Sequence, residues 1–175
     1  MTHYALLVRG INVGGKNKVV MSQLRQELTE LGVEKVDTYI NSGNIFFTST
    51  DAKAQLVEKL EAFFEVHYPF IQSFSLLSLE DFEAEIENLP EWWTKDLARK
   101  DVLFYTESLD VAQVIEKVES LELKDEVVHF GKLGIFLRQR FCLLVWVAFL
   151  LPLGKVKGDK HVSCYQRDIT KQTSI

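Results

Sequence analysis

RGINVGGKNK, the stretch from Arg9 to Lys18, separates the first apolar run of the chain from its first helical pattern. The apolar run ends at Val8, and the helical pattern begins near Met21. Glycine allows positive φ angles and lets a ligand approach the backbone closely. A glycine-rich loop between a strand and a helix can direct several N–H groups at one anion. We therefore predict that this loop is the functional site.

Around this loop, the periodicity of the first 77 residues predicts six elements in the order strand, helix, strand, strand, helix, strand. The strands are Tyr4–Val8, Lys35–Ile40, Ile45–Thr48 and Phe70–Leu77, and the helices are residues 21–31 and a helix after Asp51 that buries Leu56, Leu60, Phe63 and Phe64. Ser22 and Asp51 are the expected N-caps, and Gly32 suits the end of the first helix. This order is typical of the ferredoxin-like split β-α-β fold, an antiparallel sheet with its helices on one face.

The same succession begins again after residue 77. Ser78 and Asp81 predict a capping box for a short helix, and a strand, a helix and a hairpin follow. These three lie at Val102–Tyr105, after Asp110, and at Glu126–Phe130 with Leu133–Leu137. We predict an internal duplication: an α+β protein of two tandem ferredoxin-like (β-α-β-β-α-β) lobes with antiparallel sheets. The second lobe is incomplete unless the tail supplies one more helix and one more strand.

The predicted boundaries follow from this repeat. Residues 1–77 form the first lobe, 78–101 a helical connector and 102–153 the second lobe, partly of different origin. Residues 154–175 are a basic tail, and their polar, aperiodic composition is typical of disorder.

The composition is ordinary for a soluble globular protein, with 47% hydrophobic and 26% charged residues. The first residues lack the basic and apolar regions of a secretory signal, and two cysteines make no disulfide framework. The apolar run Phe141–Leu151 has 11 residues, whereas a membrane-spanning helix needs about 20. We therefore expect a cytoplasmic protein with no membrane partner.

The net charge of −5 conceals an asymmetry. Residues 138–175 contain seven Lys/Arg and two Asp, a net charge of +5, which leaves −10 for residues 1–137. An RNA-recognition fold shares the predicted strand order, and Phe46 is placed where such a module stacks a base. Phosphate binding requires positive charge, however, so the acidic body argues against nucleic acid as a partner.

Four short motifs carry a resemblance. Residues 4–7 are Tyr-Ala-Leu-Leu, 9–16 are Arg-Gly-Ile-Asn-Val-Gly-Gly-Lys, 38–44 are Thr-Tyr-Ile-Asn-Ser-Gly-Asn, and 130–136 are Phe-Gly-Lys-Leu-Gly-Ile-Phe. With these motifs the chain resembles a bacterial family known as domain of unknown function 1697, over roughly residues 1–137. The resemblance implies two ferredoxin-like lobes in one chain, in agreement with the repeat, and it implies no activity.

Residues 138–175 depart from the family's pattern, in which a Ser/Thr-Lys-containing helix and a Thr-x-Arg-Asn strand usually follow. The charge changes sign at the same place, and both cysteines, Cys142 and Cys164, lie beyond it. We interpret this segment as a frameshifted or recombined C-terminus. A natural divergent tail is the alternative.

The loop nearly spells the phosphate-binding P-loop, Gly-x₄-Gly-Lys-[Ser/Thr]. Asn17 stands where the Mg²⁺-binding hydroxyl belongs, and the helix starts several residues too late. An NTPase is therefore excluded, and we predict no metal and no cofactor. The remaining hypothesis is that backbone amides, with Arg9, Lys16 and Lys18, hold a phosphate or carboxylate. The alternative is a structural connection that uses glycine for tight turns.

The topology favours a site. In a ferredoxin-like lobe the loop after strand one and the turn after strand two lie at the same end of the sheet, so residues 9–18 and 41–44 should be neighbours. The predicted ligand-binding residues are Arg9, Gly10, Asn12, Gly14, Gly15, Lys16, Asn41, Ser42, Gly43 and Asn44. The expected partner is a small anionic ligand.

Catalysis at this edge is left open by the sequence. Ser42 as a nucleophile with His67 as its base lacks a third, orienting group. The alternative to ligand binding is a protein-interaction or homo-oligomeric module without catalysis, present as a monomer or weak homodimer.

Overall fold

The computed structural model describes residues 1–39, 43–95, 100–121, 123 and 126–138. They belong to two compact units. Unit 1 comprises Met1–Phe82 with Thr106–Ser108, and unit 2 comprises the described parts of Glu83–Tyr105 and Leu109–Ile175. The predictions for the run at 141–151 and for the tail at 154–175 lie outside the described residues.

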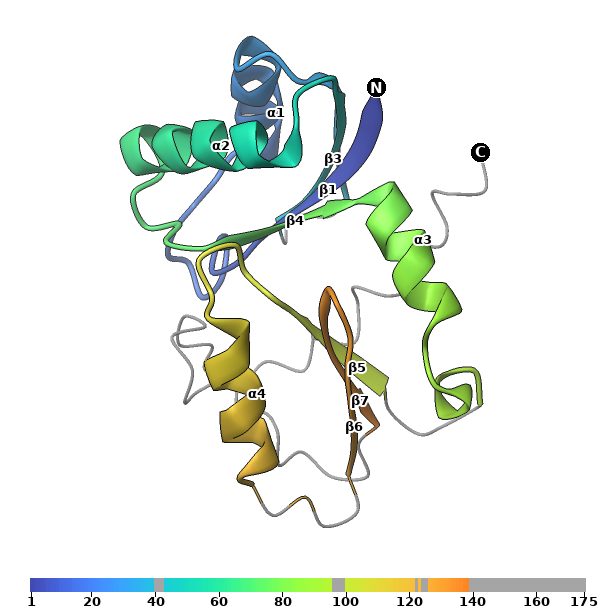
Figure 1. Cartoon of the computed structure of the whole chain (residues 1–175). Coiled ribbons are helices and arrows are strands. Elements are labelled where there is room, and N and C mark those ends of the chain that lie inside the picture. Colours follow the sequence, from blue (N-terminus) through green and yellow to red (C-terminus); the bar gives the residue numbers. More distant parts are fainter. Residues whose placement is uncertain (40–42, 96–99, 122, 124–125, 139–175) are drawn as a thin grey trace. The chain divides into compact units, whose positions relative to one another are not determined.

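Unit 1 contains the predicted succession of strands and helices (Figure 1). Its elements are β1 (Thr2–Val8), α1 (Met21–Glu30), β2 (Glu34–Tyr39), β3 (Asn44–Ser49), α2 (Lys53–His67) and β4 (Phe74–Ser78). The four strands form one sheet in the order β2-β3-β1-β4, and every neighbouring pair is antiparallel. The prediction of an α+β chain with antiparallel sheets is confirmed.

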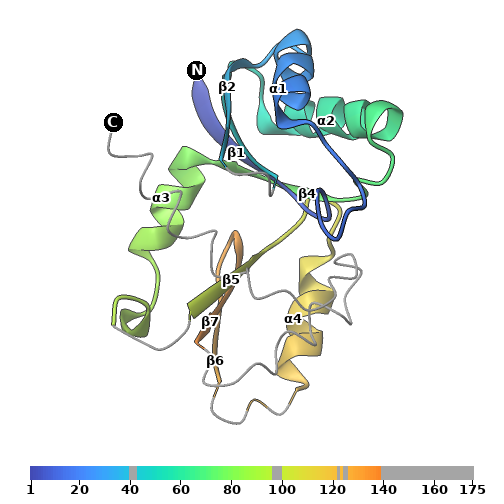
Figure 2. The same ribbon diagram turned by 180° about the vertical axis from the view of Figure 1, so that it is seen from behind.

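The core of unit 1 lies between this sheet and its two helices. In the centre of β1, Leu6 is paired with Ile45 on β3 and with Leu76 on β4. All three side chains are fully buried, together with Leu24 of α1 and Leu60 of α2. Both helices lie on the same face of the sheet (Figures 1 and 2). Apolar side chains spaced three and four apart on each helix, and two apart on each strand, therefore meet in one layer.

Unit 2 is built around a smaller sheet (Figure 2). After α3 (Leu79–Glu87) and a 3₁₀ turn at Glu91–Trp93 come β5 (Lys100–Phe104), α4 (Val111–Glu119), β6 (Val127–Phe130) and β7 (Gly134–Arg138). The strand order is β5-β7-β6, again antiparallel. One face packs Ile135 and Leu137 against Val114 and Val118 of α4. The order β5-β7-β6 repeats the order β1-β3-β2 of unit 1.

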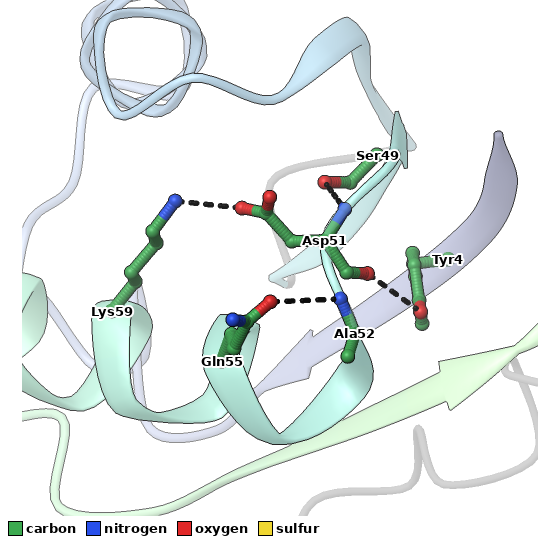
Figure 3. Close-up of polar contacts among 6 residues, drawn as sticks. All are labelled: Tyr4, Ser49, Asp51, Ala52, Gln55 and Lys59. Atoms are coloured by element: carbon green, nitrogen blue, oxygen red, sulfur yellow. Dashed lines mark hydrogen bonds and ion pairs between the residues drawn. The ribbon is translucent and has the colours of Figure 1, made fainter.

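Two predicted N-caps are wrong. Helix α1 begins after Val20, whose side chain makes no capping bond, so Ser22 is already inside the helix. Helix α2 begins after Ala52, and the Gln55 side chain accepts the Ala52 N–H at 3.3 Å. The Asp51 carboxylate instead contacts Lys59 Nζ at 2.6 Å (Figure 3). Figure 3 also shows the Tyr4 hydroxyl donating to the Asp51 carbonyl at 3.5 Å, which joins the start of α2 to β1.

Other local predictions are confirmed. The Ser78 hydroxyl accepts the Asp81 N–H at 3.1 Å, and the Asp110 carboxylate accepts the Gln113 N–H at 3.2 Å. Gly32 has φ +102° and ends α1, as its position after the helix predicted. Strand β4 is shorter than predicted and starts at Phe74 rather than Phe70. Within the described residues, no helix is both long enough and apolar enough to cross a bilayer.

Candidate functional site

The glycine-rich loop between β1 and α1 is a miniature hairpin. Val13 and Lys16 form an antiparallel bridge, and the Lys16 N–H donates to the Val13 carbonyl at 3.1 Å. Between them, Gly14 and Gly15 have φ values of +59° and +75°. Positive φ at both central positions defines a type I′ turn, which residues other than Gly, Asn and Asp rarely adopt. The two glycines therefore have a clear structural use.

Two asparagines fix the base of this hairpin. Asn12, with φ +55°, accepts the Val19 N–H at 2.8 Å and donates to the Val19 carbonyl at 3.1 Å, both through its side chain. Its own N–H donates to the Asn17 carbonyl at 3.0 Å. The Asn17 side chain donates to the Gly10 carbonyl at 2.9 Å. The loop is thus held by its own side chains in one conformation.

Asn17 was absent from the predicted site, although it helps to shape it. The signal was present in the sequence: two asparagines flank a Gly-Gly pair, and asparagine both tolerates positive φ and bonds nearby backbone.

The turn after β2 lies against the start of the loop, as predicted. The Val8 N–H donates to the Gly43 carbonyl at 2.8 Å. Gly43 has φ +84°, and a Cβ at this position would lie 2.3 Å from the Val8 carbonyl oxygen and 3.3 Å from Ile11 Cδ1. The contact therefore requires glycine on both conformational and steric grounds. Asn41 and Ser42, the other turn residues of the predicted site, lie outside the described residues.

Asn44 differs from the remaining candidates because it is buried, with 4% of its surface exposed. It opens β3, and its side-chain amide donates to the Tyr39 carbonyl at 3.5 Å. This bond spans the β2–β3 turn. A role in shaping the turn is the contribution that these contacts support.

The loop is locally basic in an acidic protein. From Arg9 to Gln26 the chain has four Lys/Arg and no Asp/Glu, although the whole chain carries −5. Lys16 and Lys18 are exposed, and Arg9 is half-buried. The fourth cation, Arg25, lies 3.7 Å from the Asp37 carboxylate. Arg9, Lys16 and Lys18 are the cations of the loop itself.

The hairpin also exposes apolar surface, which the sequence interpretation missed. Val13 precedes the turn and is 51% exposed, and Val20 follows the loop and is 61% exposed. Loop valines are ordinarily assigned to the core from sequence alone. Exposed singly they need no explanation, but here two of them flank one basic loop.

The C-terminal end of α2 gives no support for a catalytic pair. The His67 ring stacks on Phe63 with centroids 4.9 Å apart. Next to it, the Tyr68 hydroxyl donates to Glu27 at 2.6 Å. Burial, with the hydrogen bond to Glu27, raises the pKa of Tyr68, which stays protonated at neutral pH. His67 as a general base for Ser42 remains a prediction, because Ser42 is outside the described residues.

This arrangement provides positive charge on a hairpin of defined conformation. Arg9, Lys16 and Lys18 can bind an anion, and the preset hairpin limits how the loop can rearrange around it. Across the described ranges, no three His, Cys, Asp or Glu side chains converge as metal ligands do.

Comparison with known proteins identifies the family of this chain. A family model described as "Protein of unknown function (DUF1697)" matches residues 1–136. The chain belongs to this family. The resemblance found in the four sequence motifs is therefore confirmed. The DUF1697 match ends within β7, and the origin of the residues that follow stays a prediction.

A solved structure agrees with the DUF1697 assignment. The chain is similar to conserved bacterial protein SP0830 from Streptococcus pneumoniae, with 75% sequence identity and a TM-score of 0.78. The similarity covers 89% of this chain and 87% of that chain. Among curated proteins, none matches this chain. Neither the description of the family nor the name of the pneumococcal protein states a ligand or a reaction.

Proposed function

We propose that this protein binds a small anionic ligand, bearing a phosphate or carboxylate, at the β1–α1 hairpin. The observation that carries the proposal is the concentration of Arg9, Lys16 and Lys18 on one rigid loop of an acidic protein. The turn at residues 41–44 belongs to the same proposed site. Functional groups gather on loops that a rigid scaffold positions, and this loop has such a scaffold.

The mode of binding depends on which backbone N–H groups of the loop already donate hydrogen bonds. The N–H groups of Asn12, Lys16 and Val19 are already bonded inside the hairpin. The side-chain cations therefore supply most of the attraction. Binding through exposed cations weakens with added salt, because ions screen exposed charges over about 10 Å at 0.1 M.

A second candidate function is protein interaction or self-association through the same loop. The exposed Val13 and Val20 favour it, because a partner that covers these apolar side chains removes them from water. This function needs no ligand. It predicts that Val13→Ser lowers the apparent mass of a dimer by size-exclusion chromatography with light scattering.

We also propose that the two units are copies of one ferredoxin-like lobe. The support is the shared arrangement: β5-α4-β6-β7 with sheet order β5-β7-β6, and β1-α1-β2-β3 with order β1-β3-β2. A complete second copy would add a helix and a strand beside β5. In the described residues these are lacking.

The test of ligand binding is a thermal-shift screen of inorganic phosphate, nucleotides, sugar phosphates and carboxylic acids. A ligand at 100 times its dissociation constant stabilises the native state by about 2.7 kcal/mol. The Lys16→Ala and Lys18→Ala variants, at exposed positions of the loop, should lose this shift and keep their melting temperature without ligand. Lys95→Ala, an exposed lysine of unit 2, is the matched control. Shifts that survive both loop variants would transfer the proposal to the interaction function.

A further inference from the structure

Unit 1 contains a cavity that the anion proposal leaves unused. It has a volume of about 360 Å³ and lies between the C-terminal half of α2 and the segment that leads into β4. Phe64, Ile71 and Phe74 line it, and each is at most 6% exposed. Small-molecule sites commonly measure about 300–1,000 Å³ and have mostly apolar walls with a few polar groups. This cavity has the size and the wall of such a site.

The polar groups at the cavity are carboxylates. Glu61 and Glu65 line it from α2, and both are exposed, so they lie toward its mouth. Glu107 lines it from the segment beside β4, with a side chain 19% exposed. No Lys or Arg lines the cavity. Its surface therefore combines hydrocarbon with negative charge.

Glu107 is held in place by three bonds. Its backbone N–H donates to the Phe74 carbonyl at 3.0 Å, and its carboxylate accepts the Leu76 N–H at 2.9 Å. Lys53 Nζ lies 3.1 Å from the same oxygen. These contacts fix one wall of the cavity against the edge of β4. They also neutralise Glu107 in part, so the charge available to a ligand comes mainly from the other two carboxylates.

Glu61 and Glu65 are placed at a cost to the helix. Like charges four residues apart on a helix repel one another. Negative charge in the last turn of a helix also opposes the macrodipole, and Glu65 lies in the last turn of α2, which ends at His67. In the part of the chain that the structure describes, neither carboxylate has an ion-pair partner. A cation between them would relieve both unfavourable interactions.

We propose that this cavity binds a primary alkylammonium ion, a small amine whose hydrocarbon body lies on Phe64, Ile71 and Phe74. An ammonium group donates three hydrogen bonds, which suits the carboxylates of Glu61 and Glu65. The hydrocarbon body satisfies the apolar wall, which a hydrated metal ion cannot do. The net charge of −5 adds a general attraction for cations. This proposal does not depend on the anion site.

The test is isothermal titration calorimetry of the full chain with n-pentylamine, which is a monovalent ammonium ion at neutral pH. Glu61→Gln should weaken binding about tenfold, which corresponds to the loss of one good charge-assisted contact. Glu58→Gln is the matched control: it removes the same charge from an exposed position of α2 that does not line the cavity. It should change affinity less than about twofold, and 1-pentanol, the neutral analogue, should bind far more weakly than n-pentylamine.

Two further measurements separate the cavity from general attraction between charges. Ser108→Trp fills the mouth of the cavity from an exposed position without changing charge, and it should abolish n-pentylamine binding. Magnesium chloride at matched ionic strength should compete no better than sodium chloride. Undiminished binding by the Ser108→Trp variant would overturn the proposal. Equal losses in Glu58→Gln and Glu61→Gln, or no heat with the wild-type chain, would overturn it as well.

Discussion

Single residues decide the geometry of the site, and Gly43 shows this most directly. Its backbone carbonyl accepts the Val8 N–H, and its missing Cβ leaves room for the Val8 carbonyl. Neither fact is visible in the local sequence, since both depend on a partner 35 positions away (43 − 8). The sequence predicts a turn at Gly43 and predicts that this turn lies beside the β1–α1 loop. It cannot predict that the Val8 carbonyl leaves no room for a side chain larger than that of glycine.

We predict that Gly43→Ala destabilises unit 1 much more than Gly10→Ala does. Both glycines have positive φ, which costs other residues about 1–2 kcal/mol. A Cβ at Gly10 meets nothing within 4 Å, whereas at Gly43 it would lie 2.3 Å from backbone. Urea unfolding should show a loss of about 1 kcal/mol for Gly10→Ala and about 3 kcal/mol for Gly43→Ala. Equal losses would show that the turn shifts freely away from β1.

Tyr105 of unit 2 gives a prediction about pH. Its hydroxyl is buried and has no hydrogen-bond partner among the described residues. Burial, and then the charge of Glu85, raises the pKa of Tyr105 to about 12, against about 10 in an unfolded chain. Between these values the unfolded state releases a proton that the folded state keeps. The stability that depends on neutral Tyr105 is therefore complete below pH 10 and is lost as the pH rises toward 12.

Tyr105→Phe removes this dependence. At pH 8 the variant should be as stable as the wild type, or more stable by up to about 1 kcal/mol, because an unbonded hydroxyl is removed from the interior. At pH 11 its advantage in urea unfolding should be larger. The raised pKa values of Tyr4 and Tyr68 affect both proteins alike and cancel in the comparison. A stability advantage of Tyr105→Phe over the wild type that stays constant from pH 8 to pH 11 would contradict the raised pKa of Tyr105.

Among the elements, those with long apolar periodicity were predictable and their ends were less so. The spacing of Leu24 and Leu28 located α1, because only one helical face can bury them together. The capping prediction for Ser22 failed because α1 begins earlier, after Val20, and the prediction for Asp51 failed because α2 begins one residue later, after Ala52. Asp51 binds Lys59, and the Gln55 side chain reaches back to the start of α2. A residue suited to capping acts as a cap only when the helix begins directly after it, and the sequence alone does not fix that position.

The predicted start of β4 was wrong, and the hairpin in the β1–α1 loop was not predicted. Both depend on local bonding that the apolar pattern does not show. Residues 70–77 are mainly apolar, yet the Ile71 N–H donates to the Tyr68 carbonyl at 2.8 Å and holds a turn there. Pairing with β1 begins only where Phe74 meets Val8. In the loop, Gly14-Gly15 is a recognised hairpin signal, but its flanking strands are too short to show alternation. The composition of the site was predictable, and its internal bonding was not.

The β6–β7 hairpin depends on a side chain from another element. Glu85 of α3 is 6% exposed, and its carboxylate accepts the Leu133 N–H at 2.7 Å. Glu85→Ala leaves this N–H without its acceptor and should cost about 2–3 kcal/mol in urea unfolding. Glu85→Gln keeps an acceptor and should cost less. Glu83→Ala, at an exposed position of the same helix, should be nearly neutral. A similar loss in both alanine variants would show that the hydrogen bond to Leu133 is not the source of the effect, because alanine itself favours the helix.

At the scale of the molecule, the two units share an order of strands and differ in the size of their buried cores. Both repeat the same order of elements, so the sequence pattern located both sheets. The cores differ greatly, however. In the described residues, the main cluster of unit 1 holds 19 buried hydrophobic side chains and that of unit 2 holds four. Since burial of apolar area is the main source of stability, the units should not be equally stable.

We predict that native-state hydrogen exchange will show this difference. Amides in β1 and β3 should exchange at least about tenfold more slowly than those in β6 and β7, which corresponds to 1.4 kcal/mol or more in the free energy of opening. Glu85→Ala should then speed exchange in β6 and β7 and leave β1 and β3 unchanged, because its lost hydrogen bond lies within unit 2. A variant that speeds both sheets equally would mean that the units open as one cooperative body. In that case the larger core would protect both sheets, and the difference between the clusters would not govern stability.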